Sequence, residues 1–270
     1  MVQTESAETE RKAAEAEFHD RLRGELRDDP RHQSNQKWYS VAAASSHFVI
    51  DYLRHRCVGK RVLDYCCGDG EFALLLARAG ADVYGIDISP VSIENARAAA
   101  EREGLGGAAK FEVMDAEATS FSPGYFDYVH VDGVLHHLEL DKAFAELARI
   151  LKPSGQVICR EALKHNLLFR LYRKLTPHLR TAWEVDHILG KEEIGRAKEH
   201  FQEVRVLRFF HLLSLAAVPL RSTPLFGPLL RVLEGADGVC LRMPLVKWQA
   251  WIAVFLLAKP KRLSAERTSL

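Results

Sequence analysis

The sequence predicts an α/β fold in which a doubly wound, mostly parallel sheet carries helices on both faces. Short apolar segments alternate with helix-like segments from Lys60 to Ala162, and glycine or proline stands at several of the boundaries. Two further strand-like segments follow, so that about seven strands are expected. A substantial core is also expected, because 47% of the 270 residues are hydrophobic and 27% are charged.

The strands and helices of this core follow from local patterns. The segment KRVLDYC is an apolar run closed by a glycine-rich turn, and four later short segments are also strand-like. They predict strands at 60–66, 81–87, 109–116, 126–133 and 156–162. Helices are predicted between them at 71–80, 89–104 and 139–155. Ser89 is placed as the N-cap of the second helix, and Pro153 and Gly155 end the third.

The regions outside the core are less regular. Residues 1–56 are expected to form a helical segment, with a helix over 5–27, a linker over 28–36 and a helix over 40–56. After the core at 57–162, residues 163–260 predict a lid and two final strands, at 203–210 and 247–260. An apolar insertion, 211–246, separates these strands, and a disordered tail is expected over 261–270.

Composition excludes several classes of protein. Thirty-seven basic and thirty-six acidic residues leave a charge of +1, which gives no strong nucleic-acid signal. The N-terminal residues lack an apolar signal region, and the longest charge-free stretches are too short to span a membrane. Five cysteines without a CxxC pair argue against a disulfide scaffold or a zinc ribbon. A cytoplasmic protein without a metal is therefore expected.

The stretch LDYCCGDGEF predicts a loop that cradles a small organic cofactor. Glycines 68 and 70 allow a ligand to lie against backbone, and the helix that starts at Glu71 offers unpaired N–H groups. Cys66 and Cys67 are interpreted as small fillers of the turn, because the nearby sequence lacks further metal ligands or an electropositive partner. The same loop satisfies G-x-G-x-x-G/A, so an NAD(P)-dependent oxidoreductase stays open as an alternative.

Acidic residues at strand ends decide which cofactor the loop favours. Asp64 would repel a pyrophosphate but suits an ammonium group, Asp87 can accept both hydroxyls of a ribose, and Asp115 can accept from an adenine amino group beside Ala116. Asp132, at the end of the fourth strand, is assigned to the same site. An amino acid end, a ribose and an adenine together describe S-adenosylmethionine.

These motifs resemble those of the class I S-adenosylmethionine-dependent methyltransferases. VLDYCCGDGEFA looks like that family's first motif, YGIDIS its ribose motif, DAEA its adenine motif, and LKPSG the turn before strand five. The resemblance implies a Rossmann-like sheet whose seventh strand lies antiparallel between the fifth and sixth. It also implies cofactor contacts from Asp64, Cys66, Gly68, Gly70, Asp87, Ile88 and Asp115.

Catalytic and acceptor residues are predicted from their place near strand ends. Methyl transfer is an in-line displacement, and a base is needed only when the acceptor must lose a proton. His136 or His137, after strand four, could supply that base, although either could instead bond backbone. Tyr39 is predicted to cover the cofactor. Four residues are predicted to line the acceptor pocket, namely Glu161, His165, Trp183 and His187.

Three structural interpretations are possible for the insertion over 211–246. Pro219, Pro224 and Pro228 forbid one continuous helix. The segment could pack in the core or a dimer interface, wall a pocket for a hydrophobic acceptor, or lie on a membrane surface. The overall expectation is a methyltransferase, monomeric or homodimeric, acting on oxygen or nitrogen of a small, hydrophobic acceptor. A non-catalytic S-adenosylmethionine-binding protein is the remaining alternative.

Overall fold

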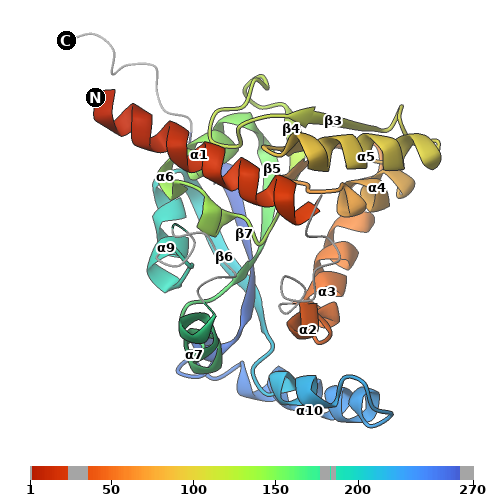
Figure 1. Cartoon of the computed structure of the whole chain (residues 1–270), viewed down its shortest axis with the longest axis vertical. Helices are drawn as coiled ribbons and strands as arrows, with labels where there is room; N and C mark the ends of the chain where they lie inside the picture. The colour runs from red at the N-terminus through yellow and green to blue at the C-terminus, as the bar shows by residue number, and fades with distance from the viewer. Residues whose placement is uncertain (1, 24–35, 177–182, 184–186, 262–270) are drawn as a thin grey trace.

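One seven-stranded sheet organises the chain (Figure 1). The computed structural model describes residues 2–23, 36–176, 183 and 187–261, so most of the predicted linker and the tail from 262 lie outside the described residues. The strand order is β3-β2-β1-β4-β5-β7-β6. The strands are β1 Arg61–Tyr65, β2 Asp82–Asp87, β3 Ala109–Val113, β4 Phe126–Asp132, β5 Leu151–Ala162, β6 Phe201–Phe210 and β7 Ile252–Pro260.

The sheet has the predicted mixed direction. Strands β1 to β5 pair in parallel, whereas β7 pairs antiparallel with both β5 and β6. The last strand is therefore the antiparallel one and lies between β5 and β6, as expected. Seven successive residues of β7, from Ile252 to Ala258, are buried, which is the pattern of a strand covered on both faces.

Helices cover both faces of the sheet. The α-helices of the described residues are α1 Val2–Arg23, α2 Gln36–Tyr39, α3 Ala43–Arg54, α4 Glu71–Arg78, α5 Pro90–Arg102, α6 Leu140–Ile150, α7 Leu167–Leu175, α9 Lys191–Arg196 and α10 Phe226–Cys240. Helices α3, α4 and α5 pack into one buried cluster, with Leu53, Leu76 and Ile93 among its members. Helices α6 and α9 pack into the cluster on the other face, through Phe144 and Ile194. Each face thus has its own core.

Two predicted boundaries differ from the structure. The helix predicted over 139–155 ends at Ile150, and Leu151 already pairs with Phe126 of β4. The next pair is Tyr128 with Gln156, so residues 152–155 are accommodated as an irregularity within β5. Pro153 and Gly155 therefore interrupt a strand and do not end a helix. The helix predicted over 40–56 is α3, which begins at Ala43 after a turn over 40–42, and the short helix α2 precedes that turn.

Helix α1 lies against the sheet through polar side chains. In the sequence, Phe18, Leu22 and Leu26 are spaced to share one helical face, yet Phe18 is half-buried and Glu15 is buried. The burial of Leu22 and the position of Leu26 lie outside the described residues. Figure 1 shows α1 crossing the molecule beside α5 and in front of the sheet, and α1 contacts α5. An acidic sheet edge, described below, is what this polar face meets.

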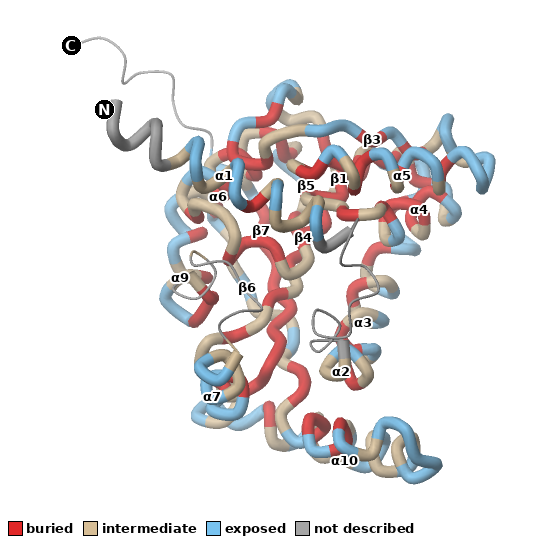
Figure 2. The backbone as a smooth tube through the Cα atoms, viewed as in Figure 1, coloured by how far each residue is buried: buried red, intermediate tan, exposed pale blue. Residues whose placement is uncertain are grey.

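The insertion over 211–246 is divided into a buried part and an exposed part. A 3₁₀ helix, η5 Ser214–Leu220, buries Leu215, Ala217 and Val218. Helix α10 then runs along the end of the molecule and is largely exposed or half-buried (Figure 2). The prolines divide the segment as predicted, since Pro219 and Pro224 precede α10 and Pro228 lies in its first turn. Among the described residues, no helix has the length and hydropathy to cross a membrane.

One buried carboxylate joins the two parts of the insertion. Asp237, on α10, accepts hydrogen bonds from the backbone N–H groups of Leu212, Leu213 and Ser214 at 3.2, 2.6 and 3.1 Å. The Ser214 hydroxyl donates to it as well, at 2.7 Å. We expect Asp237→Ala to lower the free energy of unfolding by about 3 kcal/mol, because these donors would lose their acceptor. Urea unfolding measures this, with Glu234→Ala on the same helix as control; equal losses in both variants would contradict it.

Candidate functional site

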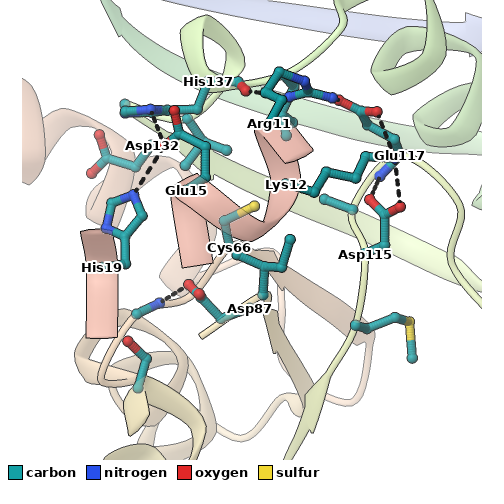
Figure 3. Close-up of a pocket in the computed structure, with 18 residues that line it drawn as sticks. Arg11, Lys12, Glu15, His19, Cys66, Asp87, Asp115, Glu117, Asp132 and His137 are labelled. Atoms are coloured by element: carbon teal, nitrogen blue, oxygen red, sulfur yellow. Dashed lines mark hydrogen bonds and ion pairs between the residues drawn. The ribbon is translucent and has the colours of Figure 1, made fainter. Parts of the chain in front are cut away.

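A pocket opens at the edge of the sheet where the parallel strands end. Its volume is about 820 Å³, including its open mouth. The walls come from the turn after β1, the ends of β2, β3 and β4, and one face of α1 (Figure 3). Eight predicted residues line it, namely Cys66, Gly68, Asp87, Ile88, Asp115, Ala116, Asp132 and His137.

The glycine turn is held open by Asp87. Gly68 and Gly70 have φ angles of 51° and 79°, in the left-handed region that glycine adopts without strain. The Gly68 N–H donates to Asp87 Oδ2 at 2.9 Å, and the Ser89 N–H donates to Oδ1 at 2.9 Å. Gly68 therefore presents its backbone to the pocket. Gly70 caps α4 away from it, where an added Cβ would lie 2.9 Å from the Ala96 side chain.

The two cysteines of the turn remain neutral thiols. Burial, together with the nearby carboxylates Asp87 and Asp64, raises the pKa of Cys66 well above its usual value. Burial and the same two carboxylates also raise the pKa of Cys67. Because the thiolate is the reactive form, this environment disfavours a nucleophilic or redox role and agrees with a structural one.

Two acidic residues after β3 are paired with cations from α1. Lys12 Nζ lies 2.8 Å from Asp115 Oδ2 and 3.0 Å from Glu117 Oε2, and Arg11 donates to Glu117 Oε1 at 2.6 Å (Figure 3). Partial burial works against the charged form of Lys12, but its hydrogen bonds to Asp115, Glu8 and Glu117 raise its pKa above the usual value. A salt-bridged network thus fastens α1 over the pocket.

Asp64 lies beneath the turn and does not line the pocket. Its Oδ1 is 2.7 Å from His130 Nδ1 on the neighbouring strand, and Phe72 stacks on that histidine ring at 3.6 Å. The other oxygen, Oδ2, is buried and has no hydrogen-bond partner among the described residues. A buried carboxylate oxygen without a donor is costly, which makes it a candidate to receive a ligand's donor group.

Asp132, in contrast, lines the pocket with both carboxylate oxygens already engaged. Arg160 donates to them from Nε and a terminal nitrogen, each at 2.8 Å. The Arg160 guanidinium also reaches the Ser45 hydroxyl at 3.2 Å. This bidentate pair fixes the end of β4 to β5.

Glu161 organises the turn after β4 and does not line the pocket. Its Oε1 accepts from the backbone N–H groups of Val134 and Leu135 at 2.8 and 2.9 Å, and its Oε2 lies 3.1 Å from His136 Nδ1. His136 is buried by this contact and is not among the lining residues. The structure therefore places this pair behind the pocket wall, in η2 Leu135–His137 and β5.

His137 faces the pocket and contacts α1. Its Nδ1 lies 3.1 Å from Glu15 Oε2, and its carbonyl accepts from Arg11 at 2.8 Å. His19 lies next to both, with its ring centroid 5.5 Å from that of His137. Of the two adjacent histidines, His137 is the one that the structure brings to the cavity.

The remaining predicted residues lie outside this pocket. Trp183 and His187 stack at 3.7 Å, and Arg11 lies 4.7 Å above the Trp183 ring, which puts this pair next to α1. His165 lies near Trp248, and Tyr39 is exposed beside Trp251. The structure does not bring these four side chains together with the strand ends.

Ten lining residues were not predicted. Four come from α1, namely Arg11, Lys12, Glu15 and His19; the others are Ser92, Met114, Glu117, Gly133, Val134 and Leu138. The spacing of the α1 residues, i, i+1, i+4 and i+8, is a sequence signal for one helical face. This lining face of α1 was not predicted, because a helix that packs against a protein core usually shows an apolar face and not a charged one.

Comparison with known proteins finds similarity to methyltransferases. Residues 62–155 match a family model described as a methyltransferase domain. The demethylmenaquinone methyltransferase of Thermus thermophilus is 38% identical over 105 residues, which cover 38% of this chain and 47% of that protein. A mitochondrial O-methyltransferase of ubiquinone biosynthesis from Schizosaccharomyces pombe is 31% identical over 152 residues, covering 55% of this chain and 52% of that protein. The chain thus spans about half the length of these two relatives.

Solved structures agree on the fold. The geranyl diphosphate C-methyltransferase of Streptomyces coelicolor, solved with S-adenosyl-L-homocysteine, superposes with a TM-score of 0.55 at 16% identity. The match covers 81% of this chain and 75% of that one. At this identity the likeness concerns the fold.

The contacts of Glu161 with Val134, Leu135 and His136 lead to a stability prediction. We expect Glu161→Ala to lower the free energy of unfolding by about 3 kcal/mol, because two buried N–H groups and the His136 ring would lose their acceptor. Thermal and urea unfolding measure the effect. Glu112→Ala, at an exposed position of β3, is the control. An unfolding free energy within 0.5 kcal/mol of the parent, about the range of ordinary surface substitutions, would show that Glu161 does not hold this turn.

Proposed function

We propose that the protein transfers a methyl group from S-adenosylmethionine to oxygen or nitrogen of a small, hydrophobic acceptor, starting from the match of residues 62–155 to a methyltransferase domain. The observation that carries the proposal is the pocket at the sheet edge, where the glycine turn meets Asp87 and Asp115. Its residues fit the successive parts of this cofactor.

The assignment of cofactor contacts follows the order of the strand ends. Gly68 lies beside the methionine part, Asp87 accepts from the ribose hydroxyls, and Ile88 packs on the adenine beside Asp115 and Ala116. Asp64 is assigned to the ammonium group of the cofactor. The assignment is supported by its buried Oδ2, which accepts no hydrogen bond from the described residues. A dinucleotide would instead bring a pyrophosphate to the glycine turn, next to Asp64, which disfavours the oxidoreductase alternative.

The residues of the chain mainly align and shield the reacting groups. S-adenosylmethionine supplies, when bound, a methyl group that the positive charge of its sulfur already activates. His137 lines the pocket and is the better candidate to take a proton from an acceptor hydroxyl or amine. His136 is held by Glu161 behind the wall, so its role is to fix the turn.

Helix α1 is proposed to act as the cover that excludes water. Its Lys12 already holds Asp115, the residue assigned to the adenine amino group. Asp115 Oδ1 also accepts from the Glu117 backbone N–H at 2.8 Å, so Lys12 must shift if the adenine amino group takes its place. Closure of α1 over a bound cofactor is thus expected to exchange some of these salt bridges.

The names of the relatives support a lipophilic acceptor. Besides the two quinone-pathway enzymes, matches include a tocopherol O-methyltransferase of rice, 38% identical over 101 residues, and a sterol 24-C-methyltransferase of Aspergillus fumigatus, 32% identical over 127 residues. Acceptors of this kind partition into membranes. The insertion over 211–246 contributes no lining residue to the pocket at the sheet edge, which favours a surface role for its exposed part.

Two exposed helices are proposed to rest on an anionic membrane. Helix α7 exposes Leu167, Leu168, Leu171 and Leu175 and carries three cations but no carboxylate. Helix α10 exposes Val232 and Val239, and its N-cap residue Leu225 is exposed as well; the three are seven residues apart and so lie on one side. Both helices pack against the same buried cluster and lie at the same end of the molecule (Figures 1 and 2). Apolar side chains next to basic ones are typical of interfacial helices.

A substitution at the ribose carboxylate tests the cofactor assignment. We expect Asp87→Asn to weaken S-adenosylhomocysteine binding roughly thirtyfold, because a hydrogen bond to a charged group contributes about 2 kcal/mol. Isothermal calorimetry measures the dissociation constant, and thermal unfolding checks that the turn survives. Asp82→Asn, at the opposite end of β2, is the matched control. Equal affinities in the two variants would contradict the assignment.

Substitutions on the exposed helices test the membrane surface. The double variant Leu171→Gln and Val232→Gln removes side chains that are 56% and 69% exposed. We expect it to weaken co-sedimentation with phosphatidylglycerol vesicles at least roughly tenfold, because each inserted side chain contributes about 1.5 kcal/mol or more. Val58→Gln, 61% exposed near the start of β1, is the control and should bind like the parent. Failure of the parent to bind these vesicles would overturn the proposal.

A further inference from the structure

We propose that Glu15, His19 and His137 form a binding site for one divalent transition-metal ion of the zinc, cobalt or nickel class. One candidate ligand atom from each residue lies within 4.8 Å of the other two. Two ligands come from α1 and the third from η2 after β4. A metal bound there would fasten the covering helix to the wall of the pocket.

The separations between ligand atoms suit a metal ion. Zinc–nitrogen and zinc–oxygen bonds of about 2.1 Å require neighbouring ligand atoms about 3.4 Å apart in a tetrahedral site. Glu15 Oε2 lies 3.1 Å from His137 Nδ1 and 3.7 Å from His19 Nε2. Both distances fall within a few tenths of an ångström of that requirement. Figure 3 shows the Glu15 carboxylate between the two rings.

The backbone presents the three side chains together. Glu15 and His19 are four residues apart on α1, and this spacing places both on one face of a helix. His137 follows from the turn that Glu161 holds through Val134 and Leu135. Both elements that carry the ligands are therefore fixed independently of the site.

Burial and charge are compatible with a cation. Glu15 is only 6% exposed, so its carboxylate lies where a partner charge is worth most. Among the described residues, the two cations of α1 that line the pocket are paired with other acids: Arg11 with Glu117, and Lys12 with Glu8, Asp115 and Glu117.

The donor set selects the class of metal. Two imidazoles and one carboxylate suit zinc, nickel, copper or iron, whereas magnesium and calcium prefer oxygen ligands throughout. Three protein ligands leave at least one position of a four-coordinate ion for a water or an oxygen of the acceptor. Coordination through Nδ1 of His137 would leave the ring proton on Nε2, so the metal-bound histidine could donate a hydrogen bond there but could not act as the base.

The test uses the full chain without a histidine tag, treated with a chelator and then titrated with cobalt(II) or zinc(II) alone. We expect one site per chain and the absorption bands of four-coordinate cobalt. His19→Ala and Glu15→Gln should each weaken the affinity at least about tenfold, since each removes one ligand. Hydrogen exchange should show slower exchange of the α1 amides once zinc is added. No step depends on methyl transfer, so the result is independent of the proposed function.

Controls separate this site from others. Glu17→Gln alters an exposed carboxylate of the same helix, and His200→Ala alters a second group, Asp141, Glu199 and His200, on the surface. Both variants should bind like the parent, with circular dichroism confirming that all variants are folded. Absence of binding in the parent, an unchanged affinity in Glu15→Gln, or loss of the site in His200→Ala would each overturn the proposal.

Discussion

The structure depends on one constraint: strands β1 to β5 run in parallel, so their carboxyl ends meet at a single edge. Asp87 and Asp132 end two of these strands and Asp115 follows a third, so the three carboxylates line one pocket. Their like charges need compensation. Backbone N–H groups compensate Asp87, Arg160 compensates Asp132, and Lys12 compensates Asp115. The edge is thus prepared for a ligand rich in hydrogen-bond donors.

Helix α1 follows from the same constraint. A helix that covers an acidic edge must present cations, which is why Arg11 and Lys12, and not an apolar stripe, face inward. Polar contacts of this kind are more easily exchanged than an apolar interface, because each ion pair can be replaced by water or a ligand. A cover that has to open for cofactor and acceptor benefits from such contacts. The cluster of Glu15, His19 and His137 lies where this cover meets the wall.

The sequence was enough to predict the sheet but not the cover. Apolar runs and glycine turns gave the strands, and the match of residues 62–155 to a methyltransferase domain confirms the family resemblance. Eight of the assigned residues line the pocket because strand ends are local features. Glu161 and His136 do not line this pocket, because their pairing depends on how β5 lies beside the turn after β4. The packing of α1 joins residues more than a hundred positions apart, and no local pattern encodes that contact.

The central claim is that the acidic edge selects S-adenosylmethionine over a dinucleotide. Calorimetric titration of the full chain with S-adenosylhomocysteine, and separately with NADH, tests it most directly. The account predicts saturable binding of S-adenosylhomocysteine at one site and no heat of binding for NADH, because the Asp64 carboxylate beneath the glycine turn would repel its pyrophosphate. Binding of NADH without S-adenosylhomocysteine would contradict the account and would mean that the glycine turn serves a dinucleotide.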